Sequence, residues 1–216
     1  MEIITLTNYL PSLQKQINCF AVRLIQSKEI WLFNCTEGCQ HILIKKNLKI
    51  NHITTIILCE LYIENISGLI GLLSSLNLFG RTQDIHIYSL ESIDSYLDLA
   101  KKYSQTNFKY NIYTHQLKTG LSIKKHNYKL YTYVDGYLLT FLFITKEKNG
   151  QFKLKKALTF NLIQGPLYGK LKSNHFFILP DGTIIRGNRF RNNNIAGRSI
   201  SLIKGKYHKR DLREIS

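Results

Sequence analysis

Residues 30–46 read IWLFNCTEGCQHILIKK, residues 54–59 read TTIILC and residues 67–78 read SGLIGLLSSLNL, and these three stretches decide the fold. The apolar run Ile30–Phe33 predicts a strand that feeds a short helix over Glu37–Lys46. The second stretch predicts a buried strand, and the third predicts a helix after a polar elbow. This β-α-β-α order indicates an α/β (or α+β) protein with a mixed sheet and helices.

The flanking sequence extends this sheet. Short runs rich in strand-forming residues predict further strands at Ile3–Leu6, Cys19–Ile25, Asp84–Ser89, Tyr128–Thr132 and Tyr137–Thr145. Ser92 is expected to cap a helix that continues to Ser104. The helix would bury one face, formed by Ile93, Tyr96, Leu97 and Ala100.

The composition changes beyond Lys146, where charged and Gly/Pro-punctuated segments replace the apolar runs. We therefore assign residues 1–145 to the α/β core and residues 146–188 to an extended, protruding basic arm that adds nothing to a core. Residues 189–216 are poor in large apolar side chains and form a basic tail that is expected to be partly disordered.

The net charge of +16 and the pI near 9.7 are the strongest physical signals in the composition. A surface this basic attracts phosphate polymers because bound counterions are released on contact. The alternative is that AT-rich codons inflated the lysine content: the chain has 22 Lys against 8 Arg, and 28 Ile against 2 Val.

The same codon bias, common in plastid genomes, indicates a plastid-encoded protein of the stroma, with the bacterial cytoplasm as the alternative. The first ten residues, MEIITLTNYL, lack the pattern of a signal or transit peptide. No membrane partner is expected, because polar residues interrupt the longest apolar region, Ile53–Leu73. The four cysteines are expected to be reduced.

Three strings, in the same order as in the family, carry a resemblance to ribonuclease Z, a tRNA 3′-end endonuclease of the metallo-β-lactamase superfamily. LFNCTEGCQ at 32–40 resembles the family's LFDCGEGTQ, and GLIGLLSS at 68–75 resembles its GLPGLLSS. GPLYGKLK at 165–172 and LPDG at 179–182 are similar to GPLFGKLK and LPDG of the family's tRNA-binding arm. The chain is thus identified as a degenerate, C-terminally shortened relative with an incomplete metallo-β-lactamase-like fold.

The resemblance also marks what is missing. The family's HxHxDH motif, which holds two zinc ions, aligns with Glu60, Tyr62, Glu64 and Asn65, and a further family histidine aligns with Leu130. The remaining family ligands belong to a second half that this sequence does not contain. No catalytic residue, no metal site and no cofactor are therefore expected. A cluster of Cys35, Cys39 and His41 resembles a zinc site only superficially.

The predicted arm keeps the family's Gly-Pro string and is densely basic. Its candidate RNA-binding residues are Lys153, Lys155, Lys156, Gly165, Pro166, Lys170, Lys172 and Arg186. The cations would neutralise phosphates, Gly165 and Gly169 would let the backbone approach RNA closely, and Pro166 would stiffen the turn. The alternative is that these lysines are merely solvated.

The resulting hypothesis is a catalytically inactive ribonuclease Z-like protein whose arm binds tRNA or another structured RNA. Three alternatives stay open. The chain could be a subunit that pairs with a second copy or with a full-length ribonuclease Z, an endonuclease that uses Glu60 and Glu64 as Mg²⁺ or Mn²⁺ ligands, or a decaying remnant.

Overall fold

The computed structural model describes residues 1–6, 19–135, 138–147, 150–160, 162–179, 182–194, 196–197 and 199–205. Contacts divide the chain into two compact units, the first built mainly from residues 1–119 and the second mainly from residues 120–204. The sequence prediction placed the boundary at residue 145, whereas the contacts divide the chain near residue 120. Residues 120–145 form strands that pair in a second sheet instead of extending the first.

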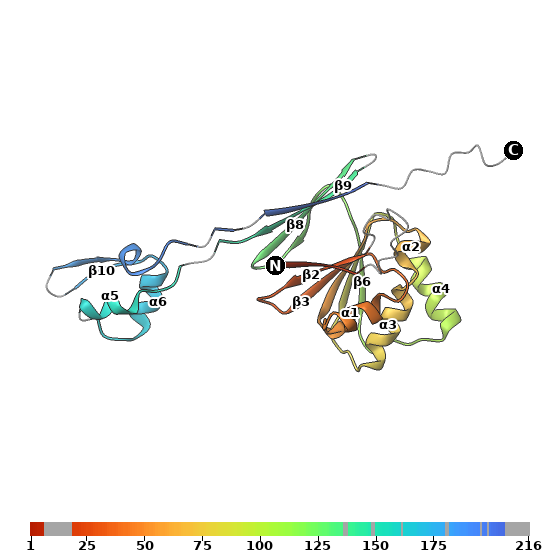
Figure 1. Cartoon of the computed structure of the whole chain (residues 1–216), viewed down its shortest axis with the longest axis horizontal. Helices are drawn as coiled ribbons and strands as arrows, with labels where there is room; N and C mark the ends of the chain where they lie inside the picture. The colour runs from red at the N-terminus through yellow and green to blue at the C-terminus, as the bar shows by residue number, and fades with distance from the viewer. Residues whose placement is uncertain are drawn as a thin grey trace. The chain divides into compact units, whose positions relative to one another are not determined.

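The first unit is a six-stranded mixed sheet in the order β1-β2-β3-β4-β5-β6 (Figure 1). The first two pairings are antiparallel, and the pairings from β3 to β6 are parallel. The strands are β1 (Glu2–Thr5), β2 (Phe20–Leu24), β3 (Glu29–Phe33), β4 (Ile53–Leu58), β5 (Ile85–Ser89) and β6 (Ile112–Gln116). Every strand that the sequence analysis names for this part of the chain is confirmed within two residues of its bounds.

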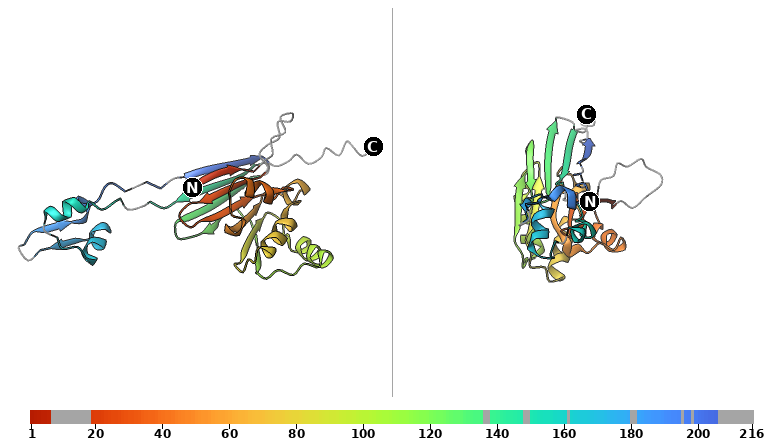
Figure 2. Two further views of the ribbon diagram at one scale, coloured as in Figure 1. Left: turned by 60° about the horizontal axis from the view of Figure 1, so that its bottom comes forward. Right: turned by 90° about the vertical axis from the view of Figure 1, so that its left-hand side faces the viewer.

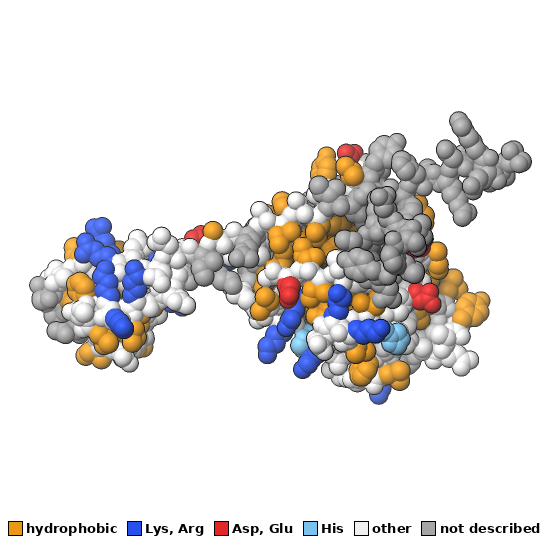
Figure 3. Space-filling model, viewed as in Figure 1, with side chains coloured by type: hydrophobic (Ala, Val, Ile, Leu, Met, Phe, Trp, Pro, Cys, Tyr) orange, Lys and Arg blue, Asp and Glu red, His pale blue; other side chains and the backbone are white. Residues whose placement is uncertain are grey.

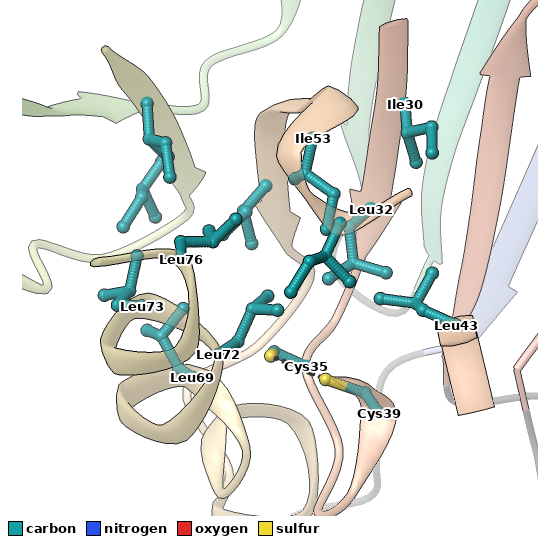
Figure 4. Close-up of a cluster of buried hydrophobic side chains, with 14 of the residues drawn as sticks. Ile30, Leu32, Cys35, Cys39, Leu43, Ile53, Leu69, Leu72, Leu73 and Leu76 are labelled. Atoms are coloured by element: carbon teal, nitrogen blue, oxygen red, sulfur yellow. Dashed lines mark hydrogen bonds between the residues drawn. The ribbon is translucent and has the colours of Figure 1, made fainter. Parts of the chain in front are cut away.

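The helices of this unit are α1 (Cys39–Lys45), η1 (Ile50–His52), α2 (Ile63–Ile66), α3 (Leu69–Leu78) and α4 (Asp94–Ser104). Helices α1 and α3 pack on one face of the sheet over alternate strand residues, among them Ile30, Leu32, Ile56 and Ile87 (Figures 1 and 4). Burial of these side chains is the main stabilising term of the unit.

Helix α4 differs in detail from its prediction. It begins at Asp94, with Ile93 at the N-cap position. Ser92 lies one residue before the N-cap position. Its hydroxyl donates to the Asp94 carboxylate at 2.8 Å and accepts from the Asp94 backbone N–H at 3.4 Å. Ile93 and Leu97 are buried as predicted, whereas Tyr96 and Ala100 are only half-buried.

The second unit begins with a four-stranded sheet in the order β12-β9-β8-β7 (Figure 2). Its strands are β7 (Gly120–Lys124), β8 (Tyr128–Asp135), β9 (Leu138–Thr145) and β12 (Ser199–Gly205). Part of the tail predicted from residue 189 forms β12, which lies beside β9. Alternation of Ser199, Ile200, Ser201 and Leu202 was the sequence signal for this strand.

Residues 150–194, called the arm below, contain α5 (Leu154–Thr159), α6 (Pro166–Lys172), β10 (Phe176–Ile178), β11 (Ile184–Arg186) and η2 (Gly187–Phe190). They enclose a small core of their own, with Ala157, Leu162, Leu171, Ile185 and Phe190 buried. The sequence prediction described an extended arm and did not include this separate core. The apolar residues that build this core are spread over more than thirty positions and show no period.

The two ends of the arm are joined. The N–H of Lys153 donates to the carbonyl of Phe190 at 2.7 Å, and the N–H of Asn192 donates to the carbonyl of Gln151 at 2.9 Å. A Cβ on Gly150 would lie 2.1 Å from the Asn192 carbonyl oxygen, so this junction requires glycine. The arm is thus a small closed structure.

Of the residues singled out from the sequence, Tyr137, Pro180, Asp181 and residues 206–216 lie outside the described part of the chain.

Candidate nucleic-acid interface

The candidate RNA-binding cations all lie on the surface of the arm. Lys153 precedes α5, whose Lys155 and Lys156 are exposed. Exposed Lys170 and Lys172 stand on α6, and exposed Arg186 ends β11. Each element also contributes an apolar residue to the arm core, which fixes the backbone that carries the cations.

The charged residues of the arm are almost all positive. Residues 150–194 contain eight Lys or Arg side chains and a single acidic residue, Asp181. In the part of the chain that the structure describes, no carboxylate forms an ion pair with any of the eight. Figure 3 shows several of these side chains as a blue group on one face of the arm. Unpaired cations held together repel one another, so an anionic ligand is favoured there.

The predicted Gly-Pro string adopts a helix instead of a stiffened turn. Pro166 occupies the first turn of α6, where its missing N–H costs nothing. A Cβ on either Gly165 or Gly169 would meet no atom within 4 Å. No neighbour within the described protein therefore requires glycine at these two positions, which leaves room for an external ligand to approach the backbone.

The four positions that align with the family's metal motif lie after β4. Glu60 and Tyr62 precede α2, and Glu64 and Asn65 belong to it. Tyr62 and Glu64 are exposed, whereas Asn65 is buried. The Asn65 side-chain amide donates to the Glu60 carbonyl at 3.3 Å, and its backbone carbonyl accepts from the Cys35 N–H at 2.7 Å. Asn65 thus connects the loop after β4 to the end of β3.

This donor set does not fit zinc. Structural and catalytic zinc sites use imidazole and thiolate ligands with few carboxylates. The four positions offer two carboxylates, a phenol and an amide, with no imidazole and no thiolate. Among the described residues, no three His, Cys, Asp or Glu side chains are placed to hold a metal ion. The position of a further family histidine is occupied by Leu130, a buried residue of β8.

Cys35 and Cys39 face each other inside the apolar core, with their sulfurs 3.2 Å apart (Figure 4). The hydrogen bond between the thiols raises the pKa of Cys35 well above its usual value, with burial adding to the effect, and lowers the pKa of Cys39. His41 is exposed on α1 and does not join the pair. The cysteines are therefore part of the packing of α1 against the sheet.

No helix within the described residues has the length and apolarity needed to span a bilayer. Comparison with solved structures places the fold: human tRNase Z, short form, superposes with a TM-score of 0.57 at 22% identity, covering 67% of this chain and 65% of that one. No protein-family model matches the chain. The predicted metallo-β-lactamase-like fold is confirmed.

Ribonuclease Z from Microcystis aeruginosa is 34% identical over 198 residues, which cover 88% of this chain and 61% of that protein. The chain thus has the metallo-β-lactamase fold and is similar to ribonuclease Z, but it spans less than two thirds of the length of that relative. Uncharacterized protein ycf56 of the red alga Pyropia yezoensis is 44% identical over 202 residues, covering 92% of this chain and 73% of the relative. The chain belongs to the ycf56 family, whose name denotes plastid-encoded reading frames.

Proposed function

We propose that this chain is a non-catalytic RNA-binding protein whose arm holds tRNA, or a similarly folded RNA, through its phosphate backbone, in the plastid stroma. The observation that carries the proposal is the excess of positive charge on the arm, which has eight Lys or Arg residues and one acidic residue. Lysine dominates, and lysine neutralises phosphate as a point charge without reading bases. Recognition of RNA by shape suits such a surface.

The rigidity of the arm supports the same proposal. A cation on a fixed backbone loses less conformational entropy on binding than one on a disordered segment. The core around Phe190 and Leu171 supplies that fixed backbone. The glycines at 165 and 169, which nothing in the described protein requires, leave the backbone of α6 accessible to a ligand.

The chemistry of the degenerate motif supports the proposed lack of catalysis. In metal-dependent hydrolysis, a bound zinc ion lowers the pKa of its water to about 7 and so supplies hydroxide near neutral pH. Glu60, Tyr62, Glu64 and Asn65 do not offer the ligands for that ion. Asn65 instead contributes hydrogen bonds to the local fold.

The test is the salt dependence of tRNA binding, measured by fluorescence anisotropy. The arm variant carries glutamine at Lys153, Lys155, Lys170 and Lys172. The control variant removes the same charge from the first unit, at Lys45, Lys46, Lys49 and Lys102. The slope of log K against log salt is negative. We expect its magnitude to decrease by about 0.7–0.9 for each phosphate that is no longer neutralised, in the arm variant and not in the control variant.

Equal slopes in the arm and control variants would contradict the proposal, because net charge alone would then explain binding. Precursor cleavage that appears only after addition of a full-length ribonuclease Z, and that depends on this chain, would identify a partner-dependent subunit instead.

A further inference from the structure

A second basic surface lies outside the arm, at the turn that joins β7 to β8. The N–H of Lys125 donates to the carbonyl of Tyr128 at 2.8 Å and closes the turn. The N–H of Lys146 donates to the carbonyl of Asn127 at 3.0 Å, which holds the end of β9 against it. Three separate pieces of chain therefore meet here through backbone hydrogen bonds.

These pieces enclose a groove of about 580 Å³, called the hairpin groove below. Its lining includes four lysines, Lys124, Lys125, Lys129 and Lys146, and the apolar side chains of Tyr128 and Ile144. None of the described residues that line it carries a carboxylate. The exposed Glu147 follows Lys146 in the chain and is the acidic residue nearest to the groove in the sequence.

A codon bias toward lysine would scatter cations over the surface. Here four lysines from two strands, a turn and the end of a third strand converge on one hollow. Because like charges gathered around one groove repel one another, an anion in the groove is favoured. A flexible ammonium group on an apolar stem suits a phosphate that is bound without base recognition.

We infer that the hairpin groove is an additional binding site for RNA backbone phosphates, separate from the cations of the arm. The inference rests on the proposed function, since it takes the same RNA as the ligand. The groove and the arm belong to the same compact unit of the chain. None of the residues that line the groove belongs to the three strings that resemble ribonuclease Z.

The experiment adds a groove variant, with glutamine at Lys124, Lys125, Lys129 and Lys146, to the arm and control variants. A second groove variant with arginine at the same four positions keeps the charge. Binding to one tRNA is measured between about 50 and 300 mM KCl, a range over which phosphate-driven binding weakens strongly. Thermal unfolding checks that each variant folds.

We expect the groove glutamine variant to have a salt slope of smaller magnitude than the control variant, by about 0.7–0.9 for each phosphate released. The arginine variant should keep the slope of the unmodified protein. If the groove glutamine variant has the same salt slope as the control variant, the inference about the groove is overturned. The proposal for the arm still stands if the arm variant has a smaller salt slope than the control. If the salt slope is smaller in the groove variant but unchanged in the arm variant, the groove binds RNA phosphates and the proposal for the arm is contradicted. A wild-type chain that does not bind tRNA contradicts both.

Discussion

The side-chain oxygen of Asn34 accepts a hydrogen bond from the backbone N–H of Cys59, at 2.9 Å between Oδ1 and N, in a fully buried position. This bond ties the end of β3 to the end of β4, where the degenerate motif begins. Asn34 stands where the ribonuclease Z string has aspartate. An amide provides the same acceptor without a buried charge, which suits a site that lacks zinc ligands.

Replacing Asn34 with alanine should destabilise the protein. The Cys59 N–H would be left without its buried acceptor, at a cost of about 1–3 kcal/mol. Alanine would also have to adopt the left-handed backbone of this position, where φ is 56°. Asn47 is the matched control, because it has a φ of 54° but is exposed. Urea unfolding should show a larger loss of stability for Asn34→Ala than for Asn47→Ala, and equal losses would contradict the role of the hydrogen bond.

Gly68 should tolerate no side chain. A Cβ there would lie 2.1 Å from the Thr36 carbonyl oxygen, and the Gly68 N–H donates to the Cys35 carbonyl at 2.9 Å. Gly68→Ala should therefore cost about 1–3 kcal/mol through forced backbone shifts.

Gly71 on the same helix provides the control for that variant. A Cβ there would lie 3.5 Å from the Gln40 side chain, an ordinary van der Waals distance. Gly71→Ala should be neutral or stabilising by about 0.5–1 kcal/mol, because alanine favours a helix interior. Denaturant unfolding should show a loss of stability for Gly68→Ala and no loss for Gly71→Ala, and similar losses in both variants would refute the prediction.

Tyr110 should make stability fall in alkaline solution. Its hydroxyl donates to the Leu73 carbonyl at 2.7 Å, and burial raises its pKa well above the usual value. The neutral form is thus favoured in the folded state. This contribution is complete below the unfolded pKa of about 10 and is lost as pH rises from there toward the folded pKa.

Tyr110→Phe should therefore flatten the fall in unfolding free energy above about pH 10, while losing roughly 0.5–1.5 kcal/mol near neutral pH with the hydrogen bond. Tyr103→Phe, at an exposed position, should change neither quantity. An unchanged alkaline limb in Tyr110→Phe would show that this phenol is not the group responsible.

Zinc should not stabilise the protein. A ligand that binds only the folded state raises the melting temperature according to its occupancy, and the degenerate motif offers no imidazole. We expect the same melting temperature with EDTA or with excess Zn²⁺. A rise with Zn²⁺ that disappears in Glu60→Ala would reveal a rebuilt site.

The sequence was sufficient to predict the first sheet because its strands alternate or are wholly apolar between clear turns. Ile30, Leu32 and Ile56 are buried against α1 and α3 as a layered α/β fold requires. The three family strings indicated the same fold, and the first of them, at 32–40, spans the junction between β3 and α1.

The arm and the hairpin groove could not be predicted in the same way. The arm core joins Ala157 to Phe190 through packing that has no period in the sequence. The groove assembles lysines that are more than twenty positions apart, Lys124 and Lys146, and only the pairing of β7, β8 and β9 brings them together.

The measurement that tests the central claim most directly combines cleavage and binding of a tRNA precursor by the purified chain, with Zn²⁺, Mn²⁺ or Mg²⁺, in low and high salt. The account predicts salt-sensitive retention of the precursor and no cleavage with any of the three metals. Metal-dependent cleavage that is abolished by Glu60→Ala would contradict it, because an active site would then exist at the degenerate motif.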